Sequence, residues 1–414
     1  MPVCFANFFT KQNRLIPPKT QTKRSCIHPV KAFFDRLRTR AAIMTLDEWI
    51  VCAAALSILL PDPIVAVLTL ITAIFLLIRP SSRKRIITLP IFFVALALLP
   101  ILVVPSIIYG YTFGIAAGLF GWSALVILIF AGSVMSVRLF SNVLDIFLAV
   151  SVVAAVYGVY CQIMGILEIG RVGSIYENPN YYGYAIELTI IAALCQYLRK
   201  GKLIYIALLV INLACNVLCD CRTAWVAILA AVTVFALMHL RKLWILLAAG
   251  GAGIAFVFIA RLIPSIGERL TLDDISHSFS NRTTYWSNAW NWFLDRPIFG
   301  SGVSSYEQLS ALHGERVLAH AHNLYLNILL DVGIVGTILF AVLAFLALKG
   351  MFARQPRERF DCFNCLVVAV LVATALHGIT DAPIVGVSTA LMFVLMLSGA
   401  QASNYSRLRT RDAA

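Results

Sequence analysis

Apolar runs separated by short polar connections dominate the chain after residue 46. Runs of roughly 15 to 22 apolar residues, bounded by charges, prolines or polar clusters, are long enough to cross a bilayer as helices. Backbone groups in lipid must be hydrogen-bonded within their own segment, and the alternating pattern of a barrel is absent, so the runs predict helices. We therefore expect an all-α, polytopic integral membrane protein with about 12 transmembrane helices. The expected spans lie at 47–60, 63–78, 87–104, 112–134, 143–167, 182–198, 203–219, 223–240, 243–263, 323–348, 363–379 and 384–400.

Two segments depart from this pattern. Residues 1–44 are polar, basic and lack an apolar core of signal-peptide length, which predicts a disordered cytoplasmic arm; alternatively, translation starts at Met44. Residues 264–322 form one long connection, and connections of that length usually carry function. The expected order is therefore the arm at 1–44, about nine spans within 45–263, an extracytoplasmic catalytic loop, partly helical, at 264–322, and C-terminal spans with a short cytoplasmic tail at 323–414.

The composition supports a membrane protein and gives its orientation. Hydrophobic residues make up 60% of the chain and charged residues only 13%, against about 25% charged residues in ordinary globular proteins. Most of the 33 lysines and arginines fall in the N-terminal arm and in alternate loops, which predicts cytoplasmic N- and C-termini. This bias accounts for the net charge of +13 without nucleic-acid binding. The few arginines on the outer side are Arg171, Arg222, Arg261, Arg269, Arg282, Arg296 and Arg316.

The middle of the long loop predicts a helix. Ser280 or Asn281 is placed to cap it, and Pro297 lies just beyond its end. Helical spacing puts Arg282 on one face with the aromatic side chains of Trp286, Trp290 and Phe293. That face suits the headgroup level of a membrane. If Arg282 has no functional role, the segment is an interfacial anchor helix with a snorkelling arginine.

Two other outer connections carry arginines. Arg171 stands a few residues before Asn180, where a turn rich in proline and glycine enters the membrane. Arg222 is followed at once by an apolar run, and an arginine so close to hydrocarbon usually has a partner or an anionic ligand. Asp220 and Asp381 are its candidate ion-pair partners. Several arginines converging on one side of a membrane fit a lipid-linked pyrophosphate, because guanidinium groups match phosphate oxygens bidentately.

A histidine stands at the entrance of the tenth span. His322-Asn323 is followed, nine residues later, by Gly333-Ile-Val-Gly336. The imidazole titrates near neutral pH and can accept a hydroxyl proton, whereas glycines three apart let helices approach closely. The alternative is an interfacial histidine on an ordinary spanning helix. No metal site is expected at Cys362 and Cys365, because this pair has no second pair or nearby histidine to complete one. No cofactor is expected either.

Four of these places together resemble the bacterial O-antigen ligase and polymerase superfamily, over most of the chain beyond about residue 143. They are Asn178-Pro-Asn180, Arg222-Thr-Ala-Trp, Arg282 with Trp290 and Pro297-Ile-Phe-Gly300-Ser-Gly302, and His322-Asn323 with Gly333 and Gly336. The spacing of His-Asn and the two glycines looks like the signature of the ligases, and the other motifs are shared more widely.

The resemblance implies a GT-C-like, metal-independent, inverting glycosyltransferase in the bacterial plasma (inner) membrane. Its donor would be an undecaprenyl-pyrophosphate-linked glycan and its acceptor a hydroxyl of a glycolipid such as lipid A core. Arg222 and Arg282 would then bind the pyrophosphate, and His322 would be the general base. A surface-polysaccharide polymerase is the alternative, and a lipid-linked glycan carrier or flippase is the alternative of another class. Expected substrate contacts are Arg171, Asn180, His320, Asn323, Trp286, Trp290 and Asp381.

Overall fold

The computed structural model describes residues 44–166, 170–240, 242–260, 272–352 and 361–402. By its contacts the chain divides into Met1–Thr45 and Leu46–Ala414, and all that follows concerns the second unit. The expected arm lies outside the described residues except for its last residue, Met44. All regular elements of the described residues are helices, as the apolar pattern predicts.

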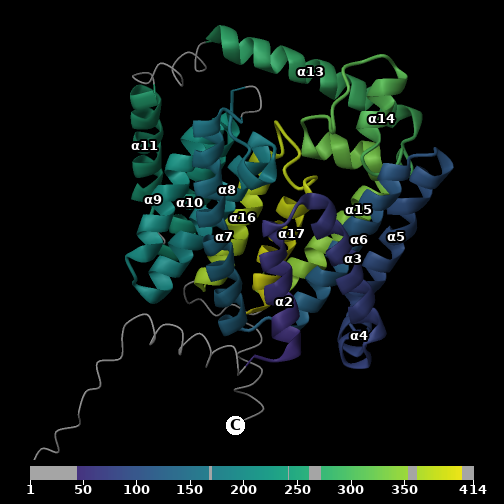
Figure 1. Cartoon of the computed structure of the whole chain (residues 1–414), viewed down its shortest axis with the longest axis horizontal. Coiled ribbons are helices and arrows are strands. Elements are labelled where there is room, and N and C mark those ends of the chain that lie inside the picture. Colours follow the sequence, from purple (N-terminus) through teal and green to yellow (C-terminus); the bar gives the residue numbers. More distant parts are fainter. Residues whose placement is uncertain (1–43, 167–169, 241, 261–271, 353–360, 403–414) are drawn as a thin grey trace, which may run out of the picture. The chain divides into compact units, whose positions relative to one another are not determined.

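The helices follow the expected spans closely (Figure 1). Their bounds are α2 (Leu46–Leu56), η1 (Ser57–Leu59), α3 (Asp62–Ile78), α4 (Pro80–Ile87), α5 (Pro90–Ile108), α6 (Thr112–Val134), α7 (Val137–Met164), η2 (Ser174–Tyr176), α8 (Pro179–Lys200), α9 (Ile204–Cys219), α10 (Arg222–Leu240), α11 (Trp244–Ala260), α13 (Leu272–Asp295), α14 (Ser305–Leu312), α15 (Leu324–Phe352), α16 (Cys362–His377), α17 (Val387–Leu397) and η4 (Ser398–Gln401).

Among the described residues, five helices are long and apolar enough to cross a membrane: α5, α6, α7, α10 and α15. The helices α3 and α4 together make a sixth if they count as one span bent by 91°. The chain is therefore a multi-pass membrane protein. Every expected span coincides with a helix, but several of these helices are shorter than a bilayer requires, so the count of about twelve stays a prediction.

Helix α8 lies inside the bundle. It packs against α7, α9, α10 and α16, and most of its side chains are buried. At its start, a Cβ atom on Gly183 would come within 2.6 Å of the Cβ of Cys221, so only glycine allows α8 to approach the beginning of α10 this closely. This approach brings the Asn180 end of α8 beside the Arg222 end of α10.

The expected span at 323–348 is interrupted in α15. Gly333 has φ 64° and ψ −169°, a conformation open essentially to glycine alone. The freed backbone groups pair with the loop before α14, where Ser301 N–H donates to Leu330 O at 2.8 Å and Ile334 N–H donates to Pro297 O at 2.8 Å. The expected close helix approach is confirmed only for Gly336, which faces Ile101 of α5, whereas Gly333 admits the loop.

The helix in the long loop starts earlier than the sequence predicts. Helix α13 already begins at Leu272, so Ser280 and Asn281 lie inside it and the predicted cap there is wrong. Instead, the Ser280 carbonyl accepts a hydrogen bond from the Thr283 hydroxyl at 2.7 Å. Helix α13 packs on α15. Their shared hydrophobic cluster comprises Ala289, Trp292, Phe293, Tyr306, Leu309, Ala321 and Leu330.

Candidate active site

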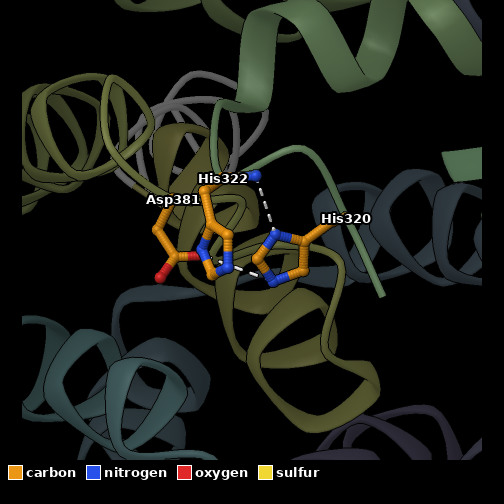
Figure 2. Close-up of side chains that lie close together, drawn as sticks. All are labelled: His320, His322 and Asp381. Carbon is orange, nitrogen blue, oxygen red and sulfur yellow. Dashed lines mark hydrogen bonds and ion pairs between the residues drawn. The ribbon is translucent and has the colours of Figure 1, made fainter. Parts of the chain in front are cut away.

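Two histidines and an aspartate meet at the end of the bundle where α13 and α14 lie, which we call the α13 end (Figures 1 and 2). His320 and His322 belong to the segment between α14 and α15, and Asp381 belongs to the connection between α16 and α17. The Oδ1 atom of Asp381 lies 3.3 Å from Nε2 of His320 and 3.5 Å from Nδ1 of His322. His320 and Asp381 are buried, whereas the side chain of His322 is 22% exposed. Among the three, His322 is therefore the residue that a substrate can reach.

The segments that carry the two histidines and the aspartate are joined by the cap of α15. The Asn323 side chain accepts hydrogen bonds from the N–H groups of Tyr325 and Leu326, both at 3.0 Å, as a helix-capping asparagine does. Its Nδ2 group donates to the carbonyl of Ile379 at 3.1 Å. Asn323 therefore holds the His322 segment against the Asp381 connection, and its expected contact with substrate stays a prediction.

Buried polar groups fix the histidine segment from behind. Asn327 accepts the N–H of Ala321 at 3.2 Å and donates to Asp331 at 2.8 Å. The other oxygen of Asp331 accepts both the N–H and the hydroxyl of Ser305, at 3.2 Å and 3.0 Å. This chain of contacts connects the start of α14 to the residue between the two histidines.

The hydrogen bonds of His320 define where its proton lies. The backbone N–H of His322 donates to Nδ1 of His320 at 3.2 Å, so Nδ1 is an acceptor. A neutral imidazole then carries its proton on Nε2, which faces the Asp381 carboxylate. Burial lowers the pKa of His320 to about 4, although the carboxylate opposes this effect. His320 is therefore a neutral donor to Asp381 at neutral pH.

Asp381 is held as an anion. Its Oδ1 also accepts the N–H of Ala382 at 2.7 Å, and its Oδ2 accepts the side-chain amide of Asn180. Burial by itself would raise the pKa of Asp381, but His320 and His322 beside it hold that pKa well below its usual range. The carboxylate is thus a fixed negative charge beside His322.

The backbone of His322 is unusual. Its φ of 49° lies in the left-handed region, which non-glycine residues adopt rarely and often at functional sites. The indole N–H of Trp286 donates to the His322 carbonyl at 3.0 Å, and the Tyr285 ring lies 5.9 Å from the imidazole ring. Nδ1 of His322 has no hydrogen-bond partner, although Asp381 lies within ion-pair distance of it. The side chain is thus positioned by its neighbours, with Nδ1 facing the Asp381 carboxylate.

Two of the predicted arginines, Arg171 and Arg282, lie around this aspartate, and Arg222 lies near Arg282. Arg171 donates to the Asn180 side chain at 2.7 Å, and Asn180 in turn donates to Asp381. Arg282 donates through Nε to the carbonyl of Thr380, the residue before Asp381, at 3.1 Å. Burial lowers the pKa of the Arg282 guanidinium; Asp381 opposes this effect, and the nearby cations Arg222 and Arg171 add to it. Arginine stays charged in such surroundings, so Arg171, Arg222 and Arg282 are cations.

The predicted aromatic face of α13 is divided between two environments. Arg282, Trp286 and Phe293 face inward, toward the site or the buried cluster. Trp290 is instead 46% exposed, and its ring lies 5.4 Å from that of Phe293. Helical spacing thus correctly groups most of the face, but it does not separate Trp290, whose role in binding substrate stays a prediction.

The residues His320, His322 and Asp381 are also the one group of the described residues whose ligand atoms lie close enough together to hold a metal ion. The hydrogen bond from His322 N–H to His320 Nδ1 opposes this use. A neutral histidine that binds a metal through Nε2 carries its proton on Nδ1, and that proton would face another donor here. The donor arrangement therefore fits a hydrogen-bonded carboxylate better than a metal centre.

A second buried pair lies behind the site and was missed by the sequence reading. Nδ1 of His377, the last residue of α16, contacts the Glu187 carboxylate of α8, and both side chains are fully buried. Nε2 of His377 lies 4.0 Å from the sulfur of Cys221, the residue before Arg222. The backbone carbonyl of His377 accepts the N–H of Asp381 at 3.1 Å. Two ionisable residues inside apolar runs are the sequence signal for such a pair. The pair joins α8, α16 and the start of α10 beneath the site.

The chain is an α-helical membrane protein whose site combines histidines with arginines. Comparison with known families narrows this class. Residues 207–341 match the O-antigen ligase family. The match places this part of the chain in the O-antigen ligase superfamily and confirms the resemblance drawn from its motifs, over a narrower range than residue 143 onward. It covers Arg222, Arg282 and His322 but neither Asn180 nor Asp381. A comparison with curated proteins found no match. The match indicates a function of the O-antigen ligase or polymerase type, and it suggests a glycosyltransferase-like enzyme with a lipid-linked glycan partner.

Proposed function

We propose that this protein is an O-antigen ligase that transfers a glycan from undecaprenyl pyrophosphate to a hydroxyl of lipid A core or a similar acceptor. The observation that carries the proposal is the Asp381–His322 pair among three arginines, within or beside the region that matches the family. The positive-inside bias of the loops puts the α13 end, and with it the site, on the outer face of the plasma membrane. Residues 264–322 then form the extracytoplasmic catalytic loop, and both termini are cytoplasmic.

His322 is the general base in this proposal. With its Nδ1–H directed at the Asp381 carboxylate, Nε2 presents a lone pair to the acceptor. The Nδ1 to Oδ1 distance of 3.5 Å is long for a hydrogen bond, and catalytic contacts of this kind commonly tighten when substrate binds. Asp381 stabilises the imidazolium that forms, as the aspartate of a catalytic triad does. Neutral His320 and Asn180 hold the carboxylate in place.

The bond changes balance in a single displacement. Nε2 of His322 takes the proton of the acceptor hydroxyl as its oxygen forms a bond to the anomeric carbon of the donor. The bond from that carbon to the pyrophosphate oxygen breaks, and its electron pair leaves with polyprenyl pyrophosphate. One displacement inverts the anomeric configuration.

The arginines stabilise the leaving group. Arg282 and Arg222, with Arg171 behind Asn180, supply positive charge that suits a pyrophosphate dianion. Such fixed cations can neutralise the developing charge as a metal ion does in other transferases, so the proposed reaction is metal-independent.

Two alternatives differ in what the site does with the donor. A polymerase uses the same chemistry with another lipid-linked glycan as acceptor, and the spacing of His322-Asn323 and Gly333 favours the ligase. A carrier would use ionisable residues deep in the membrane. Glu187 is the residue that would support a carrier, and its contact with His377 gives it a structural role instead.

Deleting the gene in its host and separating surface glycolipids and polyprenyl-linked glycans by size tests the proposal. A ligase predicts loss of glycan from the final acceptor, with long polyprenyl-linked chains accumulating. Single repeat units still attached to the acceptor would identify a polymerase. No change in either pool would contradict both enzymes and favour the carrier.

A further inference from the structure

A cavity lies at the end of the bundle opposite the catalytic site. Its volume is about 310 Å³, near the lower limit of about 300 Å³ for small-molecule pockets. It is lined by the start of α5, the middle and end of α6, the end of α15 and the segment from α17 to η4. Helix α15 begins at the α13 end and runs through the bundle to Phe352, so residues near Lys349 lie at the far end.

The walls of this cavity are apolar and its rim is polar. Leu128, Ile129, Leu346 and Leu397 supply hydrocarbon surface. Ser133, Ser398 and Gln401 add polar groups, and Lys349 is the charged residue of the lining. The Lys349 side chain is exposed, so its ammonium group is accessible at the mouth of the cavity. An elongated hydrocarbon ligand with an anionic head is complementary to this arrangement.

The surroundings of the cavity carry further positive charge. Helix α4 bends by 91° from α3, so it runs along the membrane surface if α3 crosses the membrane. It packs on α5 and α6, which both line the cavity, through a buried face that includes Ser82 and Ile86. Its exposed face carries Arg83, Lys84 and Arg85. Basic residues at a membrane surface attract anionic lipid headgroups, at about 1 kcal/mol for each cation.

We propose that the cavity is a binding site for an anionic phospholipid of the inner leaflet. An acyl chain lies between α6 and α15, against Leu128 and Leu346, and the phosphate is held at the mouth by Lys349. The site is separate from the catalytic centre, and its ligand makes no bond. The proposal commits to a phospholipid for two reasons. A free phosphate ion would leave the apolar walls uncovered, and a neutral chain would leave Lys349 without an anion.

Native mass spectrometry of the full-length protein tests this site. The purified protein is extracted in mild detergent with equimolar phosphatidylglycerol and phosphatidylethanolamine, and the retained lipid is identified. Wild type is expected to retain phosphatidylglycerol preferentially. Lys349→Ala is expected to lower that retention about five-fold, the equivalent of about 1 kcal/mol. Lys202→Ala, an exposed lysine in another loop at the same end, is the matched control and is expected to retain the lipid fully.

A cavity-filling variant distinguishes the cavity from the charged surface. A Cβ atom on Gly132 meets only the Gln401 side chain, at 3.5 Å, so Gly132→Leu places its side chain in the cavity. This variant is expected to release the lipid although all cations remain. Ala347→Leu fills the same space from α15 and serves if Gly132→Leu does not fold. Equal retention of both lipids by wild type, or unchanged retention in Lys349→Ala or in a folded cavity-filling variant, would overturn the proposal.

Discussion

Asp381 organises the candidate site because one buried carboxylate serves several partners. Oδ1 faces both imidazoles and accepts a backbone N–H, and Oδ2 accepts the amide of Asn180. Buried charges are tolerated only when they are paired and hydrogen-bonded, so these partners are required as much as the aspartate itself. A consequence is that His320, which the sequence places among substrate contacts, is occupied by Asp381 and buried. Its contact with substrate stays a prediction, and its contact with Asp381 is structural.

The neutrality of His320 predicts how stability depends on pH. The folded protein holds the pKa of His320 at about 4, whereas the unfolded chain has the ordinary value of about 6.5. Between these values the unfolded state binds more protons, so stability is full above pH 6.5 and falls as the pH drops toward 4. The loss is on the order of 3 kcal/mol.

His320→Gln keeps one hydrogen-bond acceptor and one donor in the side chain, but it removes the group that titrates between about pH 4 and 6.5. Unfolding in detergent, measured from pH 7 to pH 4, is expected to show a shallower loss of stability in this variant than in wild type. Identical pH profiles for the two proteins would contradict a neutral, buried His320.

Replacing Arg282 by another cation is expected to lower the rate of transfer, because the guanidinium does more than supply charge. Arg282→Lys loses the Nε donor to the Thr380 carbonyl and the fork that matches phosphate oxygens. A hydrogen bond to a charged group contributes about 1.5–3 kcal/mol, so we expect transfer to fall roughly 10- to 150-fold. Arg316→Lys, at an exposed arginine of the same loop region, is the control and is expected to transfer normally. An Arg282→Lys variant as active as wild type would show that charge alone suffices.

The broken helix α15 explains how one element serves both packing and the site. Its first part carries the cap at Asn323 and the Asn327–Asp331 contacts behind the histidines. Its second part begins beyond Gly333 and forms most of the span, with Gly336 against α5. The loop with Gly300 and Gly302 fills the break and leads into α14. A single glycine therefore separates the spanning part of α15 from the part that packs behind the two histidines.

Gly333→Ala tests the break directly. Its Cβ would lie 2.4 Å from the Ile298 carbonyl oxygen, and the required backbone conformation is strained for alanine by about 1–3 kcal/mol before any clash is counted. We expect a marked fall in Tm in detergent. Gly121→Ala in α6 has nothing within 4 Å of the new Cβ and is expected to be neutral or slightly stabilising. Equal Tm values for the two variants would mean that α15 tolerates a continuous helix at this point.

The buried pair of Glu187 in α8 and His377 in α16 predicts that a single substitution lowers stability more than replacement of both residues. His377→Ala leaves the Glu187 carboxylate buried without its partner, at a cost of about 3–5 kcal/mol. Replacing both residues, as Glu187→Met with His377→Leu, removes the charges together and is expected to recover most of the lost stability. Thermal unfolding of the single and double variants measures this difference. A double variant less stable than His377→Ala would contradict the pair as the source of the loss.

For the whole molecule, the sequence predicts the helices better than their assembly. Periodicity and charge place a helix at every expected span, because an apolar run in a bilayer has few other structures available. The sequence also points to single residues such as His322 and Arg282, since a titratable or charged group beside hydrocarbon is costly, and their roles stay predictions. The contact between Asn180 and Asp381 joins residues 201 positions apart, and the contact between Glu187 and His377 joins residues 190 apart. The sequence marks such buried ionisable residues but does not show which of them pair, because the pairing depends on how the helices pack.

The central claim is that His322 is the base of a glycan transfer. Proteoliposomes containing the purified protein, a polyprenyl-pyrophosphate-linked glycan and the lipid acceptor allow the transferred glycan to be measured directly. His322→Ala is expected to lower the rate by about 10²–10⁴-fold while donor binding stays near normal, since general-base catalysis contributes that factor. His313→Ala, whose imidazole stacks on Trp292 in the same loop region, is expected to transfer at the wild-type rate. Near-normal transfer by the His322→Ala protein would contradict the mechanism.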